Sequence, residues 1–445
     1  MTADTFVEQV QRAMDHFIQV AHVAAPDELP LLLSESASAF GAPDAGMFLA
    51  DLQQRTLIGF EGPGHQLHPY AEPLGIDSTI AGRAFQHMQR VTQAAVESHD
   101  ERTRVWLPLL DGTERFGVLG LTLAREQVED DAGMTRLQRF ASVVTEVLMS
   151  KAQYGDSIVN ARRTRPMTLA AEIQWSLLPP LTFVNHSVSV TGGLEPAYEV
   201  AGDSLDYAIS TDQAHFGVFD GMGHGIISAQ LISLVVAAYR NARRAGLSLV
   251  ETAAHIEDGV HDVFRTESFA TGVLCELDTA TGVLSWVSAG HHEPLLLRGG
   301  HLVRALKVDP LLPFGLNKAL SPGTSPPVGT EHLEPGDIVL LYTDGVLEAR
   351  SPDGEFFGQE RLVDMIVRNL ASGLPTPEVL RRVVHALLAH QADSLEDDAT
   401  LLLVEWHGAG APLQDPELSL TGRRAIDPPL VDVAADDPSV SGRGS

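Results

Sequence analysis

The sequence contains a single cysteine, Cys275, among its 445 residues. One cysteine cannot form a disulfide within the chain, and alone it cannot build a thiolate zinc site or an iron–sulfur cluster. Because Cys275 stands in an apolar run, we expect a buried and chemically inert thiol. The chemistry of this protein must therefore come from other side chains.

Basic residues are also scarce. The chain has 30 Lys and Arg residues against 59 Asp and Glu residues, which gives a formal net charge of −29. A surface of this sign repels the phosphates of nucleic acids and of anionic lipids, so we expect no nucleic-acid and no membrane partner. Basic proteins and divalent cations are the partners that such a surface favours.

Long apolar runs are missing as well. The longest, around residues 231–239, is about half the length of a membrane-spanning helix. The N-terminus lacks the basic and apolar blocks of a signal peptide. The chain also has no Gly-rich phosphate loop with its lysine, which argues against a kinase. These absences predict a cytoplasmic protein.

The length of the chain favours two or three domains. Residues 5–150 mix amphipathic helical periods with strand-like runs, and Asp111-Gly112 is a strong hairpin signal. We predict a small α+β domain here. The helix expected around residues 137–148 could continue to about Arg163.

Residues 151–180 follow as predicted linker or switch helices. Pro166 interrupts the helical period, and Pro179-Pro180 ends it. The apolar stripe of these helices suits two roles equally well. It could mediate dimer contacts and signal transmission, or it could simply pack on its own domain.

The remaining chain divides into a globular and a polar part. Residues 181–408 are strand-rich, with two helical stretches near 226–243 and 376–389. Residues 409–445 are rich in Pro, Gly, Asp and Ser without periodicity. This composition predicts a disordered tail.

Aspartates stand at four strand ends of the globular part. They are Asp203 with Asp206 behind it, Asp220-Gly221, Asp344-Gly345 and Asp397-Asp398. Any one of these alone is most often a plain turn, and we expect nothing more of the Asp-Gly pairs at positions 111, 258 and 353. The set taken in order, with its flanking residues, favours a site.

Those flanking residues resemble the motifs of one family. Asp220-Gly221-Met222-Gly223-His224-Gly225 is similar, almost letter for letter, to a motif of the SpoIIE/RsbU branch of metal-dependent protein phosphatases. Further segments over residues 168–406 resemble its other motifs, namely 199–206, 269–271, 288–291, 313–315, 333–349, 357–362 and 397–400. Ala201, Ser204 and Phe314 depart from the usual residues and put substrate fit in question more than metal binding.

The resemblance implies a fold and a metal site. The fold is an α-β-β-α sandwich, two stacked sheets flanked by helices, holding two Mn²⁺ or Mg²⁺ ions at one edge. Asp220 would bridge both ions, with the Gly221 carbonyl as a further ligand. Asp344 and Asp397 would hold one ion and Asp203 the other, while Asp398 and Asp206 are weaker candidates. Hard divalent ions prefer such oxygen ligands.

The mechanism implied is direct attack of a metal-activated water on phosphorus, so no cysteine nucleophile is needed. Asp220 is the central catalytic residue. His224 is a candidate general acid because histidine titrates near neutral pH, although a turn-stabilising role is the more ordinary one. His291 and His292 are adjacent, and on a strand they would point to opposite faces. For them we expect a structural role.

The N-terminal part, about 5–150, resembles a GAF domain of unknown ligand, with a PAS-like sensor as the alternative. Residues 172–180 resemble the entry helix that couples a sensor to the metal site in relatives. The resemblance implies a serine/threonine phosphatase acting on a phosphorylated STAS-type anti-anti-sigma protein, as a homodimer. The alternatives are a phosphatase-fold scaffold without turnover and a GAF-regulated cyclase or phosphodiesterase, for which no metal–histidine pattern is found.

Overall fold

The structure is a computed structural model of the chain. It describes residues 5–63, 72–94, 102–195, 197–199, 202–392 and 397–409. The tail expected from residue 409 onward lies outside the described residues, apart from its first position. Among the residues that are described, no helix combines the length and the apolar character needed to cross a membrane.

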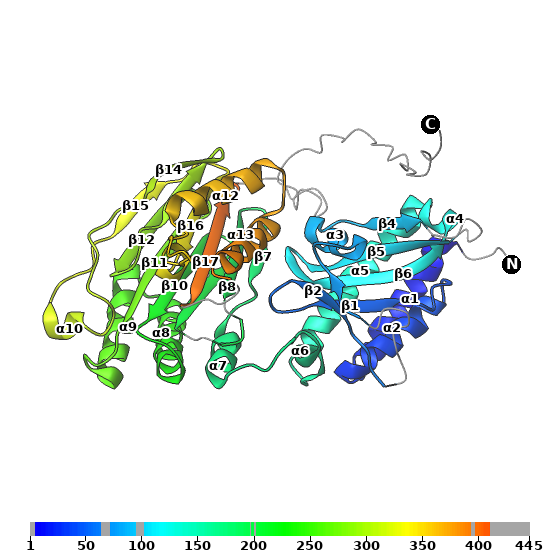
Figure 1. Cartoon of the computed structure of the whole chain (residues 1–445), viewed down its shortest axis with the longest axis horizontal. Helices are drawn as coiled ribbons and strands as arrows, with labels where there is room; N and C mark the ends of the chain where they lie inside the picture. The colour runs from blue at the N-terminus through cyan, green and yellow to red at the C-terminus, as the bar shows by residue number, and fades with distance from the viewer. Residues whose placement is uncertain are drawn as a thin grey trace, which may run out of the picture.

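The N-terminal part is built on one antiparallel sheet with the strand order β3-β2-β1-β6-β5-β4. Its strands are β1 (Gly46–Ala50), β2 (Thr56–Gly59), β3 (Leu74–Gly75), β4 (Val91–Ala94), β5 (Arg102–Asp111) and β6 (Glu114–Ala124). Its helices are α1 (Phe6–Ala21), η1 (Pro26–Glu28), α2 (Leu29–Ser38), α3 (Ile80–His87), α4 (Arg125–Val128) and α5 (Asp131–Lys151). Both faces of the sheet are covered (Figure 1).

Alternation along the strands explains the two covered faces. In β1, Met47 and Leu49 pack against α1, α2 and α5, whereas Phe48 and Ala50 belong to the cluster under α3. Successive side chains of a strand point to opposite faces, so an uninterrupted apolar strand needs cover on both. The predicted strand at 46–50 and the hairpin at Asp111-Gly112 are confirmed.

The connection between the two halves differs from the prediction of one long helix. α5 ends at Lys151, and a short α6 (Ser157–Ala161) follows after a turn that contains Gly155. Glycine lowers helix stability by about 1 kcal/mol relative to alanine, which favours a break there. α7 (Leu169–Leu177) is capped by the Thr168 hydroxyl and stops before Pro179-Pro180, as predicted.

The C-terminal part contains two sheets. One has the order β15-β12-β11-β10-β9, and the other β14-β13-β16-β17-β8-β7. The first comprises β9 (Asp203–Ile209), β10 (Gln213–Gly221), β11 (Ala270–Asp278), β12 (Val283–Ala289) and β15 (Gly329–His332). The second comprises β7 (Thr182–Val184), β8 (Val188–Glu195), β13 (Leu295–Arg298), β14 (His301–Ala305), β16 (Asp337–Tyr342) and β17 (Ala399–Trp406).

Three apolar clusters place these sheets in layers. The central cluster joins side chains of both sheets and includes the fully buried Cys275. A second lies between the first sheet and the helices α8 (Ile226–Arg244) and α9 (Leu249–Phe264). The third lies between the second sheet and α12 (Gln359–Ala371) and α13 (Thr376–His390). The result is the order helix, sheet, sheet, helix (Figure 1).

The sequence prediction of only two helical stretches here was wrong. Besides α8 and α13, the C-terminal part contains α9 and α12, together with the short α10 (Asn317–Leu320) and α11 (Asp344–Leu347). α9 buries Leu249, Ala253, Ile256 and Val260. These positions have helical spacing, but Glu251, His255, Glu257 and Asp258 between them weaken the apolar pattern.

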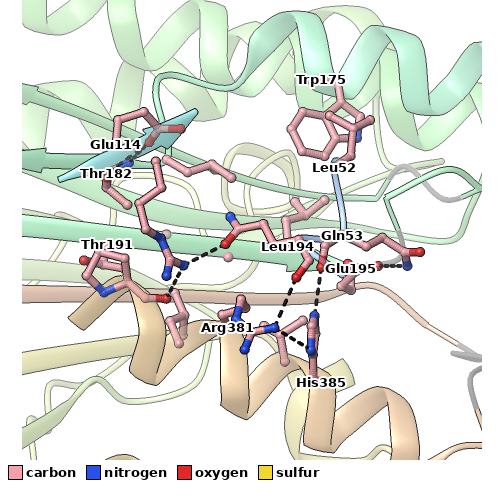
Figure 2. A pocket seen from close by; sticks show the side chains of 18 residues that line it. Leu52, Gln53, Glu114, Trp175, Thr182, Thr191, Leu194, Glu195, Arg381 and His385 are labelled. Atoms are coloured by element: carbon pink, nitrogen blue, oxygen red, sulfur yellow. Dashed lines mark hydrogen bonds between the residues drawn. The ribbon is translucent and has the colours of Figure 1, made fainter. Parts of the chain in front are cut away.

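A buried ionic network joins the two halves. Arg115 of β6 donates to Glu378 of α13 at 2.9 Å, and both side chains are almost fully buried. Arg381, one turn further on, bonds Glu378 and also Asp77 of the N-terminal part. Figure 2 shows Arg381 and His385 directed from α13 toward Gln53, whose carbonyl lies 2.8 Å from His385 Nε2.

Candidate active site

Two of the predicted aspartates lie opposite each other in the first sheet. Asp203 begins β9, Asp220 is the penultimate residue of β10, and the two are registered partners in the antiparallel ladder. Directly opposed residues of an antiparallel pair project to the same face at close range. The Gly221 N–H donates to the Gly202 carbonyl at 2.7 Å, which extends the pairing past the strand.

The second sheet delivers the other acids at the same end of the sandwich. Asp344 follows β16 as the first residue of the short helix α11, and Asp397-Asp398 immediately precedes β17, the neighbour of β16. Gly345 is required between them. A Cβ built at this position would lie 1.8 Å from the main-chain oxygen of Asp398, closer than any side chain can come.

Hydrogen bonds tie the two sheets together at this point. Asp398 Oδ2 accepts the backbone N–H groups of Gly202 at 2.5 Å and of Asp203 at 3.1 Å. The Thr343 hydroxyl donates to Asp203 Oδ2 at 2.6 Å and accepts the Thr400 N–H at 2.9 Å. Three chain segments therefore meet around Asp203 and Asp398, both of which are 2% exposed.

The acids raise one another's pKa values. Burial, and then the negative charges of Asp344 and Asp397, raise the pKa of Asp220 to about 7. Burial raises the pKa of Asp398 to about 7, with Asp397 and Asp220 adding to it against the two backbone hydrogen bonds. Burial and the charges of Asp398 and Asp220 hold the pKa of Asp203 well above its usual range.

A bound cation would stabilise this group of carboxylates. The charged groups that act most strongly on the pKa values of Asp203, Asp220 and Asp398 are other aspartates, and neighbouring carboxylates are stabilised when a divalent ion joins them. Asp398 Oδ1 is buried without a hydrogen-bond partner within the described part of the chain. An oxygen left in this state is available as a metal ligand.

The donor set suits Mn²⁺ or Mg²⁺ because it consists of oxygens. The side chains are farther apart than in an assembled metal site. Over the described ranges, no three His, Cys, Asp or Glu side chains converge closely enough to ligate one ion. The acids thus form one electrostatic site whose carboxylates would draw together around a cation. Which of them ligate it stays a prediction.

Gly221 keeps its main chain accessible to that site. Its carbonyl accepts the Ser228 hydroxyl of α8 at 3.0 Å, which leaves the second lone pair of the oxygen for another partner. A Cβ at Gly221 would come within 2.9 Å of both Ile232 Cγ1 and Ser228 Oγ. Glycine is therefore needed here for close packing of α8 on the end of β10.

His224 and Asp206 occupy different surroundings. His224 is exposed in the loop between β10 and α8, where its charge lowers the pKa of Asp397 against the raising effect of burial. Asp206 is buried on β9, and its carboxylate binds Arg240 and Arg243 of α8. Asp206 therefore anchors a helix, which accounts for its burial without a metal.

The adjacent histidines lie in a loop, because β12 ends at Ala289 and Gly290 adopts a positive φ of 64°. The expectation that they sit on a strand was wrong. His291 Nε2 lies 3.1 Å from the Tyr342 carbonyl, and Nδ1 lies 2.8 Å from the Thr271 hydroxyl. Burial lowers the pKa of His291 to about 4, so its neutral ring links β11 to β16.

Two residues that contact Asp203, Thr343 and Gln174, were not predicted individually, although both lie in segments that resemble motifs of the family. Thr343 bonds Asp203 directly. In α7, Gln174 Nε2 donates to the Asp203 main-chain oxygen at 2.5 Å, and Trp175 Nε1 donates to the Ala197 carbonyl at 2.8 Å. The resemblance of residues 172–180 to an entry helix was the sequence signal that pointed to a contact between α7 and the site.

Comparisons with known proteins find one matching family model and several relatives. Residues 210–407 match the family model "Stage II sporulation protein E (SpoIIE)". Protein IcfG of Synechocystis sp. is 31% identical over 137 residues, which is 31% of this chain and 20% of that protein. The phosphoserine phosphatase RsbU of Bacillus subtilis is 23% identical over 236 residues, 53% of this chain and 68% of RsbU.

Among solved structures, the SiaA-PP2C domain of Pseudomonas aeruginosa is 22% identical, with a TM-score of 0.45 over 57% of this chain and 98% of that domain. The chain thus spans only a fifth of IcfG and about two thirds of RsbU. The family model and the sequence relatives support a SpoIIE-type phosphatase domain over residues 210–407.

Proposed function

We propose that this chain is a metal-dependent serine/threonine protein phosphatase whose activity is controlled by its N-terminal domain. The observation that carries the proposal is the grouping of Asp203, Asp220, Asp344, Asp397 and Asp398 at one end of the sandwich, where the neighbouring acids raise the pKa values of Asp203 and Asp220. Phosphoryl transfer needs cations at such a place, because the reacting group itself is an anion.

The roles of the residues follow from their positions. Asp220, which interacts electrostatically with Asp203, Asp344 and Asp397, would be the central acid holding the cations, and the Gly221 carbonyl would be a further oxygen ligand. When bound, a pair of divalent cations supplies an activated water and neutralises the phosphoryl oxygens. Asp398 holds the Gly202–Asp203 backbone and offers its free Oδ1.

A proton must reach the serine or threonine oxygen as it leaves. His224 is exposed on the loop that follows Asp220 and interacts electrostatically with Asp397, so it is the group we assign to this step. No covalent phosphoenzyme is involved. Cys275 is fully buried in the core, where burial raises its pKa far above the usual range, and it has no part in the reaction.

A protein substrate suits the surface beside the acids. Met222, Ile226 and Ile227 are 43%, 45% and 61% exposed, and they follow Asp220 directly in the loop and the first turn of α8. Exposed apolar side chains grouped beside a polar site are typical of protein contact surfaces. By its resemblance to the SpoIIE/RsbU branch, we propose a phosphorylated STAS-type anti-anti-sigma protein as the substrate, and a sigma factor as the final target.

The N-terminal domain is proposed to be a GAF-like sensor, and the linker helices to support a homodimer in the cytoplasm. α7 is the element through which the sensor would act on the acids, because Gln174 touches the Asp203 backbone and Glu172 pairs with Arg163 of the linker. A change in the position of α7 would change the position of Asp203.

The test is hydrolysis of p-nitrophenyl phosphate and of a phosphorylated STAS-domain protein by the purified full chain with Mn²⁺. Asp220→Asn should abolish both activities while the circular dichroism spectrum stays unchanged. Asp353→Asn, at an exposed turn, is the matched control and should retain activity. Metal-independent turnover, or full activity in Asp220→Asn, would rule out the proposed mechanism.

A second candidate is a scaffold that binds phosphoprotein without turnover. The looser placement of the acids, with no three converging in the described residues, is the observation that favours it. The same assay separates the two. A scaffold would bind the phosphorylated STAS-domain protein in pull-down experiments and release no phosphate at any Mn²⁺ concentration.

A further inference from the structure

A cavity of about 320 Å³ lies where the N-terminal domain and the two linker helices, α6 and α7, meet. Its wall combines Leu52 and Phe116 of the N-terminal domain, Ile158 and Val159 of α6, and Trp175 of α7. This volume is at the lower end of the range of pockets that hold small organic ligands. In Figure 1, α6 and α7 mark the passage between the two halves.

Most of the wall is apolar. Phe116 and Ile158 of α6 are buried in the apolar core of the N-terminal domain, and Met167 and Trp175 line the same space. Leu52 and Trp175 also border the smaller space drawn in Figure 2, where their side chains are neighbours. An apolar cavity of this size between parts that are tied together by ion pairs provides a place for an acyl chain or an aromatic ring.

Two arginines line this cavity, but Arg163 is paired with Glu172, which also lines it, through hydrogen bonds of 2.7 and 2.9 Å. Arg162 has no such carboxylate partner in the part of the chain that the structure describes. The Arg162 guanidinium stacks on Phe116 at 4.5 Å, and its Nε donates to the Ala50 carbonyl at 2.9 Å. Its two terminal nitrogens make no hydrogen bond within the described ranges of the chain, and the residue lines the cavity. Glu114 and Asp51 offset part of the charge electrostatically.

We propose that this cavity binds an amphiphilic monoanion, such as a medium-chain carboxylate, with its apolar body between Phe116 and Trp175 and its anionic group on Arg162. Charge-assisted hydrogen bonds from a guanidinium to a carboxylate are strong and directional, and stronger where water is excluded. Arg162 therefore favours a negatively charged ligand, and the apolar wall favours a ligand with a hydrocarbon chain or ring.

Because α7 lines the cavity, ligand binding should affect the position of the acids. Trp175 and Ser176 belong to α7, whose Gln174 bonds the Asp203 backbone. A ligand that fills the space fixes α7 against the linker and the N-terminal domain. This consequence for activity rests on the proposed phosphatase function, whereas the binding itself does not.

Binding is tested on the full chain by isothermal titration with decanoate, decanol and decyltrimethylammonium. Decanoate should bind saturably with one site and the tightest affinity. Arg162→Gln should weaken decanoate at least tenfold, as expected for loss of a charge-assisted hydrogen bond, and leave decanol within about twofold. Absence of phosphatase activity would leave this result untouched.

Two filling variants and one control complete the test. Val159→Phe and Ser176→Trp place a ring in the cavity from opposite walls, and each should reduce decanoate binding at least tenfold. Val23→Phe makes the same kind of change at a side chain that is 87% exposed and does not line the cavity. Equal binding of all three probes, unchanged binding in both filling variants, or no saturable binding would overturn the proposal.

Discussion

The stability of the metal-free protein should fall as the pH rises, because its acid cluster is built for a cation. Asp398 shows the effect most clearly, since it is 2% exposed and its pKa is raised from 3.8 to about 7. The folded state therefore holds this proton more tightly than the unfolded state. The contribution of the protonated Asp398 to folding stability is fully present below about pH 4 and is lost as the pH rises through 7.

The magnitude follows from the pKa. Moving a pKa from 3.8 to about 7 corresponds to about 4 kcal/mol of lost folding free energy once the group is ionised. Asp398→Asn cannot ionise, and its amide oxygen can still accept the Gly202 and Asp203 N–H groups. At pH 8 in EDTA this variant should melt higher than the parent, on the order of 10 °C for a domain of this size.

The assay is thermal unfolding followed by circular dichroism, at pH 5 and pH 8, in EDTA and in Mn²⁺. Mn²⁺ should raise the melting temperature of the parent at pH 8 far more than that of Asp398→Asn. The exposed Asp353→Asn should follow the parent in every buffer. If Asp398→Asn melts below the parent at pH 8 in EDTA, ionisation of the buried Asp398 does not destabilise the metal-free protein, and the reasoning is refuted.

Three further outcomes are expected. His224→Gln should slow hydrolysis of a phosphoserine peptide about 10²-fold or more but leave p-nitrophenyl phosphate nearly unaffected, because only the poor leaving group needs a proton; equal losses on both substrates would point to a loop-stabilising role. Gly345→Ala should lower stability by about 1–3 kcal/mol in denaturant titrations because its Cβ meets the Asp398 carbonyl, whereas Gly259→Ala, with nothing nearer than 3.9 Å, should not. Glu378→Gln should lower stability by about 3–5 kcal/mol in the same titrations, because it leaves Arg115 buried without its charge partner. In the parent, burial raises the pKa of Glu378, but Arg381 and Arg115 outweigh it and lower that pKa to about 2. The stabilisation by this ion pair is therefore present above about pH 4.5 and is lost as the pH falls toward 2.

Local patterns in the sequence were sufficient for most elements. The strand at 46–50, the hairpin at Asp111-Gly112 and the stop at Pro179-Pro180 depend on neighbours a few residues away, and each was predicted. α9 was missed because polar residues interrupt its apolar stripe. The placement of the acids at strand ends was also predictable, because strands deliver the residues that follow them to a sheet edge.

Contacts between distant segments could not be read in this way. The Thr343–Asp203 hydrogen bond joins residues 140 positions apart, and the Arg115–Glu378 pair joins residues 263 apart. No local pattern specifies such partners, since their proximity arises from the packing of sheets and domains. The same reasoning explains why Asp206 looked like a possible ligand, although Arg240 and Arg243 hold it instead.

The lone cysteine offers an experimental consequence. Cys275 lies in β11 between the two sheets of the C-terminal part, fully buried, and no second thiol exists in the chain. A thiol reagent can reach it only when the sheets separate, so its reaction rate measures the frequency with which the sandwich opens. Labelling kinetics of the unmodified protein, recorded with and without Mn²⁺ or decanoate, would therefore report directly on the rigidity of the domain, with no engineered probe.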